Sequence, residues 1–172
     1  MHEFLIPVKT VAGLNAIRLH EIFTYCEDTG DLIRRYKTGP NVKLGVVAGH
    51  IDAQGYRRVR VDGVTCAAHR VAWVMVHGSE PVGSIDHING VRSDNRAANL
   101  RDVSHSVNLQ NQRKPRSDNV LGVQGVRALG GKYEARIWTE GRGVSLGSFA
   151  TAAEASTAYR KAKRAMHEGC TI

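Results

Sequence analysis

Four polar side chains within residues 86–108 constrain the fold of this chain more than any other feature. They are Asp86, His87, Asn99 and Asn108. These side chains can act together only if the intervening chain doubles back and brings them to one place. Asp86 and His87 are neighbours, so on a regular strand they would point to opposite faces, whereas at a strand end or a bulge they can splay around one site.

The residues between these four predict a strand, a loop, a second strand and a helix. Residues 90–98 (GVRSDNRAA) begin with glycine and are polar and rich in arginine, as loops often are. Residues 99–103 (NLRDV) are expected to form a short return strand. Ser104 is a suitable N-cap because its hydroxyl can accept a free backbone N–H, and it predicts a helix from His105 to about Arg113.

The chemistry of the four side chains suits hydrolysis of a phosphate ester. The Asp86 carboxylate and the Asn108 amide carbonyl are oxygen donors, which a hard cation such as Mg²⁺ prefers. His87, with an ordinary pKa near ~6.5, can take a proton from water at neutral pH. Asn99 can hold the other ring nitrogen of that base. The alternative is a turn residue beside a solvated imidazole, because Asn and Asp are common in loops for their turn geometry alone.

Residues 69–113, HRVAWVMVHGSEPVGSIDHINGVRSDNRAANLRDVSHSVNLQNQR, resemble the HNH endonuclease family. More narrowly, they resemble its phage and intron homing branch, in which asparagine often replaces the final histidine. The resemblance implies that His87 is the general base and that Asn99 orients it. It also implies that Asp86 and Asn108 bind one divalent metal ion, Mg²⁺ or in its place Mn²⁺.

Three further residues of this segment leave alternatives open. Asn95 also lies between the histidines, in the predicted loop. His105 stands three residues before Asn108 and can replace it as a metal ligand. His69 opens a predicted helix at residues 70–77, and we interpret it as structural or phosphate-contacting rather than catalytic.

The chain is basic, with 24 lysines and arginines, 16 acidic residues and a net charge of +8. This favours a polyanionic partner, although a merely soluble basic protein would carry the same charge. No apolar run approaches the ~20 residues of a membrane span, and residues 1–10 lack the apolar core of a signal peptide. Cys26, Cys66 and Cys170 are far apart and odd in number, which argues against a disulfide framework and a structural zinc and fits a reducing cytosol.

Short strands are expected to dominate the chain before this motif. Residues 14–23 have the apolar spacing of a short helix. A hairpin is expected in residues 25–35, where Asp-Thr-Gly-Asp separates two stretches with apolar residues. Residues 45–61 predict two more strands, and Asp62-Gly63 after them is a turn of the hairpin type.

A second module is predicted after a basic, polar linker that contains Pro115. Three short strands are expected at residues 122–127, 132–138 and 144–149, followed by a helix at residues 151–166. The helix opens with a capping-box pattern and has an apolar stripe of small residues, which let it lie close to the sheet. In the second strand, alternation predicts one face against the helix and one in solvent.

Residues 122–168 resemble the APETALA/ethylene-response-factor type of DNA-binding domain, found in plant transcription factors and appended to phage HNH nucleases. The resemblance rests on the segments GVQGVR, GKYEARI, SLGSF and TAAEASTAY. It implies that the sheet enters the major groove of DNA, whereas the alternative is a solvated sheet face. Ser145 stands where plant members often have tryptophan, so no base preference follows. The expected DNA-binding residues are Arg127, Lys132, Arg136 and Trp138, together with Arg96 and Arg113 outside this module.

The expected fold class is α+β: a β-rich N-terminal part with a ββα-metal nuclease motif, then a three-stranded antiparallel sheet packed on one helix. The expected domains are a leader at 1–20, a β-rich and nuclease region at 21–113, a basic linker at 114–121 and a DNA-binding domain at 122–168. We expect a homing endonuclease that cuts double-stranded DNA, a phage protein in the bacterial cytoplasm, alone or as a homodimer. The first alternative is a sequence-specific DNA-binding regulator with an inactive nuclease module, and the second is an RNA-binding or RNA-cutting protein.

Overall fold

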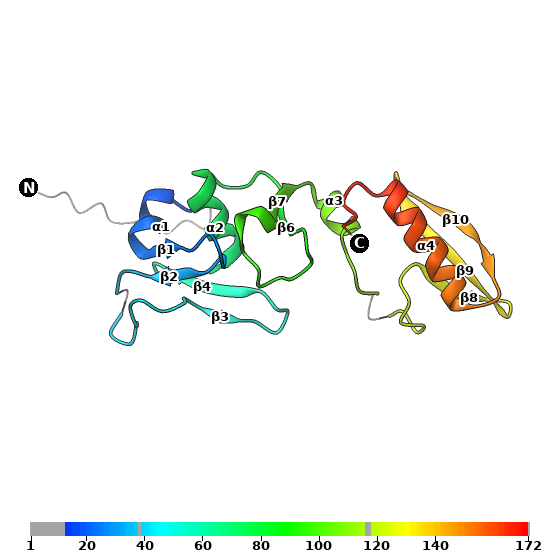
Figure 1. The fold of residues 1–172 in the computed structure, drawn as a ribbon, viewed down its shortest axis with the longest axis horizontal. Helices are drawn as coiled ribbons and strands as arrows, with labels where there is room; N and C mark the ends of the chain where they lie inside the picture. Colours follow the sequence, from blue (N-terminus) through cyan, green and yellow to red (C-terminus); the bar gives the residue numbers. More distant parts are fainter. Residues whose placement is uncertain (1–12, 38, 116–117, 172) are drawn as a thin grey trace, which may run out of the picture. The chain divides into compact units, whose positions relative to one another are not determined.

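The computed structural model describes residues 13–37, 39–115 and 118–171. By their contacts these residues form two compact units (Figure 1). The first unit extends to His87 and includes Val91–Asp102, whereas the second comprises Ile88–Gly90 and the residues from Val103 onward. The predicted linker at 114–121 therefore falls inside the second unit. The main boundary between the units lies after Asp102. Residues 1–12 of the predicted leader lie outside the described residues.

The first unit begins with a short helix and a hairpin. Helix α1 (Ala16–Ile22) starts after Asn15, whose side chain accepts the backbone N–H groups of Ile17 and Arg18. This N-cap satisfies donors that have no partner inside the helix. Strands β1 (Phe23–Tyr25) and β2 (Leu32–Arg34) pair antiparallel, so the predicted hairpin is confirmed.

A three-stranded antiparallel sheet follows, in the order β3-β4-β5. Its strands are β3 (His50–Ile51), β4 (Arg57–Val61) and β5 (Val64–Ala67). The turn from β4 to β5 is Asp62-Gly63, and the two residues have φ of 43° and 89°. A two-residue hairpin turn of this type needs positive φ at both positions, which Asp tolerates and Gly adopts without strain.

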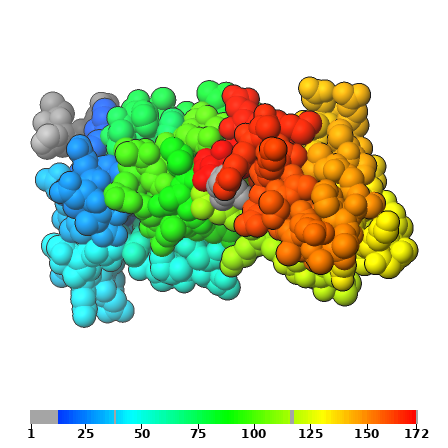
Figure 2. Space-filling view, turned by 45° about the vertical axis from the view of Figure 1, so that its right-hand side comes forward, coloured from blue at the N-terminus to red at the C-terminus, as the bar shows by residue number. Residues whose placement is uncertain are grey.

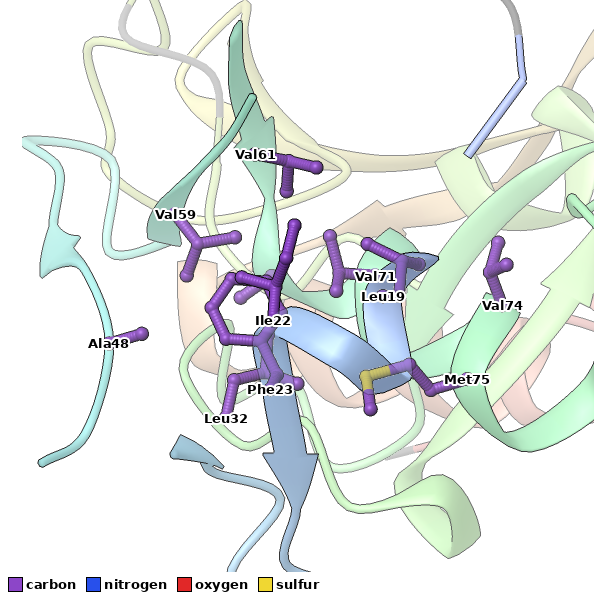
Figure 3. Packing of buried hydrophobic residues seen from close by; sticks show 11 residues of the cluster. Leu19, Ile22, Phe23, Leu32, Ala48, Val59, Val61, Val71, Val74 and Met75 are labelled. Carbon is purple, nitrogen blue, oxygen red and sulfur yellow. The ribbon is translucent and has the colours of Figure 1, made fainter. Parts of the chain in front are cut away.

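The core of the first unit contains residues of α1, of the β1–β2 hairpin, of strand β4 and of helix α2 (Ala68–His77). Figure 3 shows apolar side chains converging from the two helices and from the strands. Each fully buried aliphatic or aromatic side chain of this size contributes about 1.5–3 kcal/mol to folding, so the cluster anchors the unit. Its fully buried members include Leu19, Ile22, Phe23, Leu32, Val71 and Val74.

The chain after α2 adds a small sheet of two strands, β6 (Ser84–His87) and β7 (Leu100–Val103). Ile85 of β6 and Leu100 of β7 pack against Ala72 of α2, which fastens the sheet to a helix of the core. The predicted return strand begins at residue 99, one position earlier than the strand in the structure.

Asn99 instead ends a 3-10 turn, η1 (Ala97–Asn99). Its backbone N–H donates to the carbonyl of Arg96 at 2.8 Å, as in a 3-10 turn. The side chain of Tyr25 on β1 holds the same loop, because its hydroxyl donates to the carbonyl of Asn95 and accepts the N–H of Ala97. The loop between β6 and β7 is thus attached to the first hairpin.

Helix α3 (His105–Gln110) follows β7 and belongs to the second unit. The predicted cap is confirmed, because the Ser104 hydroxyl accepts the N–H of Val107 at 3.3 Å. The helix is three residues shorter than the predicted one. Asn111 caps its C-terminal end, and the Asn111 N–H donates to the carbonyls of Asn108 and Leu109.

The rest of the second unit is a three-stranded antiparallel sheet covered by one helix, as predicted. The strands β8 (Val126–Leu129), β9 (Lys132–Thr139) and β10 (Arg142–Phe149) lie in the order β10-β9-β8. Helix α4 (Ala152–Met166) packs on this sheet, and Figure 2 shows its outer side, in orange to red, uncovered. The first strand begins four residues later than predicted. Within the described part of the chain, no helix is long and apolar enough to cross a membrane.

A capping box stabilises the start of this helix, and apolar packing holds the helix on its sheet. Thr151 and Glu154 form the predicted capping box, each side chain accepting the backbone N–H of the other residue. The buried face of β9 contributes Ala135 and Ile137, which are fully covered, and Tyr159 of α4 packs among them. The alternation predicted for this strand is confirmed.

Residues 167–171 return to α3 and bind it within the second unit. The N–H of Gly169 donates to the side chain of Gln110 at 3.0 Å, and the Thr171 hydroxyl donates to the side chain of Asn111. Lys163 of α4 is buried, and its ammonium donates to the carbonyl of Gln112 just beyond α3. Burial lowers the pKa of this lysine, and the carbonyl partner offsets part of the desolvation.

Candidate active site

Asp86 and His87 end strand β6, and both side chains are buried, with 6% and 4% of their surface exposed. Successive strand residues point to opposite faces, and the two side chains accordingly have different neighbours. Asp86 faces Arg101 of β7, and the ring of His87 faces the ring of His69 on α2. A buried carboxylate beside a buried imidazole is the costly arrangement that functional sites maintain.

The Asp86 carboxylate forms an ion pair that the sequence interpretation did not include. The Nε and one terminal nitrogen of Arg101 donate to the same carboxylate oxygen, Oδ2, at 2.9 and 2.7 Å. Arg101 lies on β7, the strand paired with β6, so strand pairing brings the two side chains together. This pairing was hidden in the sequence because it depends on the register of two short strands.

The ring of His87 is held by Asn95. Its Nε2 lies 3.2 Å from the amide oxygen of Asn95, a residue with 1% of its surface exposed. In the tautomer that carries its hydrogen on Nε2, the ring donates to this amide oxygen and its basic lone pair is on Nδ1. Burial lowers the pKa of His87, and the Asn95 contact opposes that shift.

Two aromatic rings enclose this base. The ring centroid of His87 lies 5.2 Å from that of His69 and 6.0 Å from that of Tyr56. Burial, and secondarily the neighbouring His87, lower the pKa of His69 to about 3. His69 is therefore uncharged at neutral pH and packs beside the base as a neutral ring.

Asn99, the residue predicted to orient His87, is buried in the turn before β7. Its amide nitrogen donates to the backbone carbonyl of Asp94 at 2.8 Å, which fixes the end of the loop that carries Asn95. The role predicted for Asn99 at the ring of His87 stays a prediction. Asn95, which the sequence interpretation left open, contacts that ring through its amide oxygen.

The other predicted metal ligand, Asn108, lies on α3 in the second unit and is half-buried. His105, the alternative ligand, is exposed at the first position of the same helix. The assignment of Asn108, with His105 as its alternative, stays a prediction.

Few metal-binding side chains of the described residues surround Asp86. Among the residues that the structure describes, no group of three or more His, Cys, Asp or Glu side chains is arranged to hold a metal. Asp86 contributes one buried carboxylate. A hard ion such as Mg²⁺ is commonly held by one or two carboxylates and completes its shell with water and substrate phosphate, so this sparse set fits it.

The segment that contains these residues matches a known protein family. Residues 66–110 match the family model described as HNH endonuclease. The matched segment contains Asp86, His87, Asn95, Asn99 and Asn108, and it spans about a quarter of the chain. The chain therefore carries an HNH endonuclease domain, which indicates a nuclease that acts on DNA. No curated protein and no solved structure matches the chain.

The residues predicted to bind DNA from the second sheet lie on its solvent side. Trp138 on β9 is 66% exposed, and Arg136 on the same face reaches the carbonyl of Gly143. Arg127 of β8 forms an ion pair with Glu134, a partner that the sequence interpretation missed. Lys132 is exposed at the start of β9. Arg136 and Trp138 also line an open hollow of about 680 Å³ in this unit.

Two further predicted DNA-binding residues have partners within the protein. Arg96 forms an ion pair with Asp94 at 2.6 Å while remaining exposed. Arg113 donates to the carbonyl of Ile88 and to the hydroxyl of Thr171. Their binding to DNA stays a prediction, and it would compete with these internal contacts.

Proposed function

We propose that this protein is a metal-dependent DNA endonuclease of the homing type, in which His87 is the general base. One observation carries the proposal: the buried pair Asp86 and His87, with His87 held by Asn95, lies inside the segment that matches HNH endonucleases. A general base needs its ring oriented and its lone pair directed at water, and the Asn95 contact supports such an arrangement.

In the proposed mechanism, Nδ1 of His87 removes a proton from a water molecule that attacks the phosphorus. Burial lowers the pKa of His87, which favours the neutral ring, the form that can take up this proton. Asp86, with Asn108 or His105, would hold the divalent ion. When bound, the ion neutralises charge on the scissile phosphate and stabilises the leaving oxygen. The ion pair with Arg101 fixes the orientation of the Asp86 carboxylate.

The second unit is proposed to supply affinity and site preference. A three-stranded sheet packed on one helix is the architecture expected for the APETALA/ethylene-response-factor type, and it places Arg136 and Trp138 on the open face. Arginine on such a face can reach guanine edges in the major groove. One active site in a monomer would nick DNA, whereas a homodimer could cut both strands.

The direct test is a cleavage assay on supercoiled plasmid, linear duplex, single-stranded DNA and RNA, with Mg²⁺ or with chelator. We expect duplex cutting that requires the metal. His87→Ala should lower the rate ~10²–10⁴-fold while DNA binding is retained. The matched control is His50→Ala, since His50 is exposed on β3 and outside the site.

The outcomes separate the alternatives. Binding without any cutting would favour a regulator with an inactive nuclease module, and preferential cutting of RNA would favour an RNA-directed protein. Near-normal cutting by His87→Ala would remove His87 from the mechanism, and full activity in chelator would rule out the metal. Loss of metal binding in His105→Ala, with Asn108→Ala unaffected, would reassign the second ligand.

A further inference from the structure

Arg92 and the proposed general base, His87, both lie next to the ring of Tyr56. The Arg92 guanidinium carbon lies 4.9 Å from the Tyr56 ring centroid. The same ring lies 6.0 Å from the ring of His87, centroid to centroid. The guanidinium and the imidazole therefore contact one tyrosine, within the first unit.

Arg92 differs from the other arginines around this site in having no carboxylate partner among the described residues. Arg101 is paired with Asp86, Arg58 with Asp52 and Arg96 with Asp94, at N–O distances of 2.7, 2.7 and 2.6 Å. No carboxylate among the described residues forms an ion pair with Arg92, which is exposed. Its positive charge is thus uncompensated by the protein at a place where a phosphate is expected.

The guanidinium of Arg92 is also held in place before any ligand binds. One terminal nitrogen donates to the carbonyl of Gln54 at 2.9 Å, and the Tyr56 ring supports the planar group. A guanidinium has five N–H donors in a rigid fork that matches two phosphate oxygens, so donors remain for a ligand. Fixing the fork in advance reduces the entropy lost on binding.

We propose that Arg92 binds a phosphate of the DNA strand that is cut at His87, with Tyr56 and Gln54 as the residues that position it. This inference rests on the proposed function and names the group that would hold its substrate. Gln54 and Tyr56 precede the matched segment 66–110, so the hairpin of β3 and β4 completes the site from outside the family pattern. The guanidinium neutralises phosphate charge and fixes the strand relative to the base.

The test uses the full chain with three variants: Arg92→Ala, Arg92→Lys and the control Arg60→Ala. Arg60 is an exposed arginine of β4 that, like Arg92, donates to a backbone carbonyl, that of Gly63. The first measurement is affinity for duplex DNA in chelator across salt concentrations, which does not depend on cleavage. Each phosphate contact contributes about 0.9 to the slope of log affinity against log salt.

We expect Arg92→Ala to lower that slope by about 1 and Arg60→Ala to leave it unchanged. In Mg²⁺ and saturating DNA, Arg92→Ala should cut roughly 10- to 100-fold more slowly, corresponding to two well-formed charge-assisted contacts. Arg92→Lys should keep the salt slope because the charge remains, but lose rate because the planar fork is gone.

The proposal would be overturned by an unchanged slope and rate in Arg92→Ala, or by an equal loss of slope in Arg60→Ala. If Arg92→Ala fails to fold, the cleavage rate of Arg92→Lys tests the proposal. A wild-type rate in that variant would exclude recognition of the phosphate by the guanidinium fork. Failure of the proposed function has a different signature: the wild-type protein binds DNA with the Arg92-dependent slope but does not cut it.

Discussion

At the scale of single residues, burial determines how the two histidines beside Tyr56 titrate. The pKa of both is lowered, and that of His69 falls to about 3. Because His69 is buried, the folded state binds fewer protons than the unfolded chain between about pH 3 and pH 6.5. Burial of neutral His69 is therefore tolerated above pH 6.5, and the free energy of unfolding decreases as the pH falls through that window.

We predict that His69 accounts for a measurable part of acid destabilisation. From pH 7 to pH 5 it should lower the free energy of unfolding by about 2 kcal/mol, because 1.4 kcal/mol corresponds to one pKa unit. In His69→Gln, which does not titrate, this part should be absent while the part from His87 remains. Urea unfolding of both proteins at the two pH values measures it, and an identical decline in both would contradict the assignment.

At the scale of elements, Gly30 lets the β1–β2 hairpin lie against the loop that carries Asn95. Its φ is 75°, and a Cβ there would come within 2.3 Å of the backbone nitrogen of Arg96. The same loop is held by the hydroxyl of Tyr25 on β1. The first hairpin therefore positions the residue that holds the ring of His87.

We predict that Gly30→Ala displaces this loop and slows cleavage, with a loss of stability above the ~1–2 kcal/mol of left-handed strain alone. The matched control is Gly130→Ala, because Gly130 has φ of 56° and nothing within 4 Å of its Cβ position. Thermal unfolding and cleavage rates compare the two. Equal behaviour of the two variants would show that contact with the loop is unimportant.

Elements with a strong local signal could be predicted from the sequence, and those set by tertiary pairing could not. The capping box of α4, the Asp62-Gly63 turn and the Ser104 cap each depend on local hydrogen bonds or φ preferences. Asn95 has the same side-chain chemistry as Asn99 and lies four residues before it, so composition alone could not indicate that Asn95 contacts the ring of His87. Arg101 could not be assigned either, because its role depends on the pairing of β6 with β7.

At the scale of the whole molecule, the family match and the compact units divide the chain differently. The matched segment ends at residue 110 and includes α3, but α3 groups with the second unit. Residues 167–171 and Lys163 bind α3 and the residues just after it. The proposed metal ligand Asn108 is thus carried by a helix that depends on the C-terminal module.

We predict that removing residues 167–172 impairs cleavage more than DNA binding. The truncation removes the hydrogen bonds of Gly169 and Thr171 to α3, while the sheet with Arg136 and its covering helix remain. Single-turnover cleavage and duplex affinity, measured on the same preparation, separate the two effects. Unchanged cleavage would show that α3 is held adequately without this segment.

The contact between Thr171 and Asn111 joins residues that are 60 positions apart. During synthesis at roughly 5–20 residues per second, several seconds pass between the appearance of α3 and the appearance of the segment that binds it. The first unit, whose residues all precede position 103, is complete well before then. A nascent chain therefore acquires the Asp86–His87 pair early and a supported α3 late, so nuclease activity is expected to follow completion of the second module.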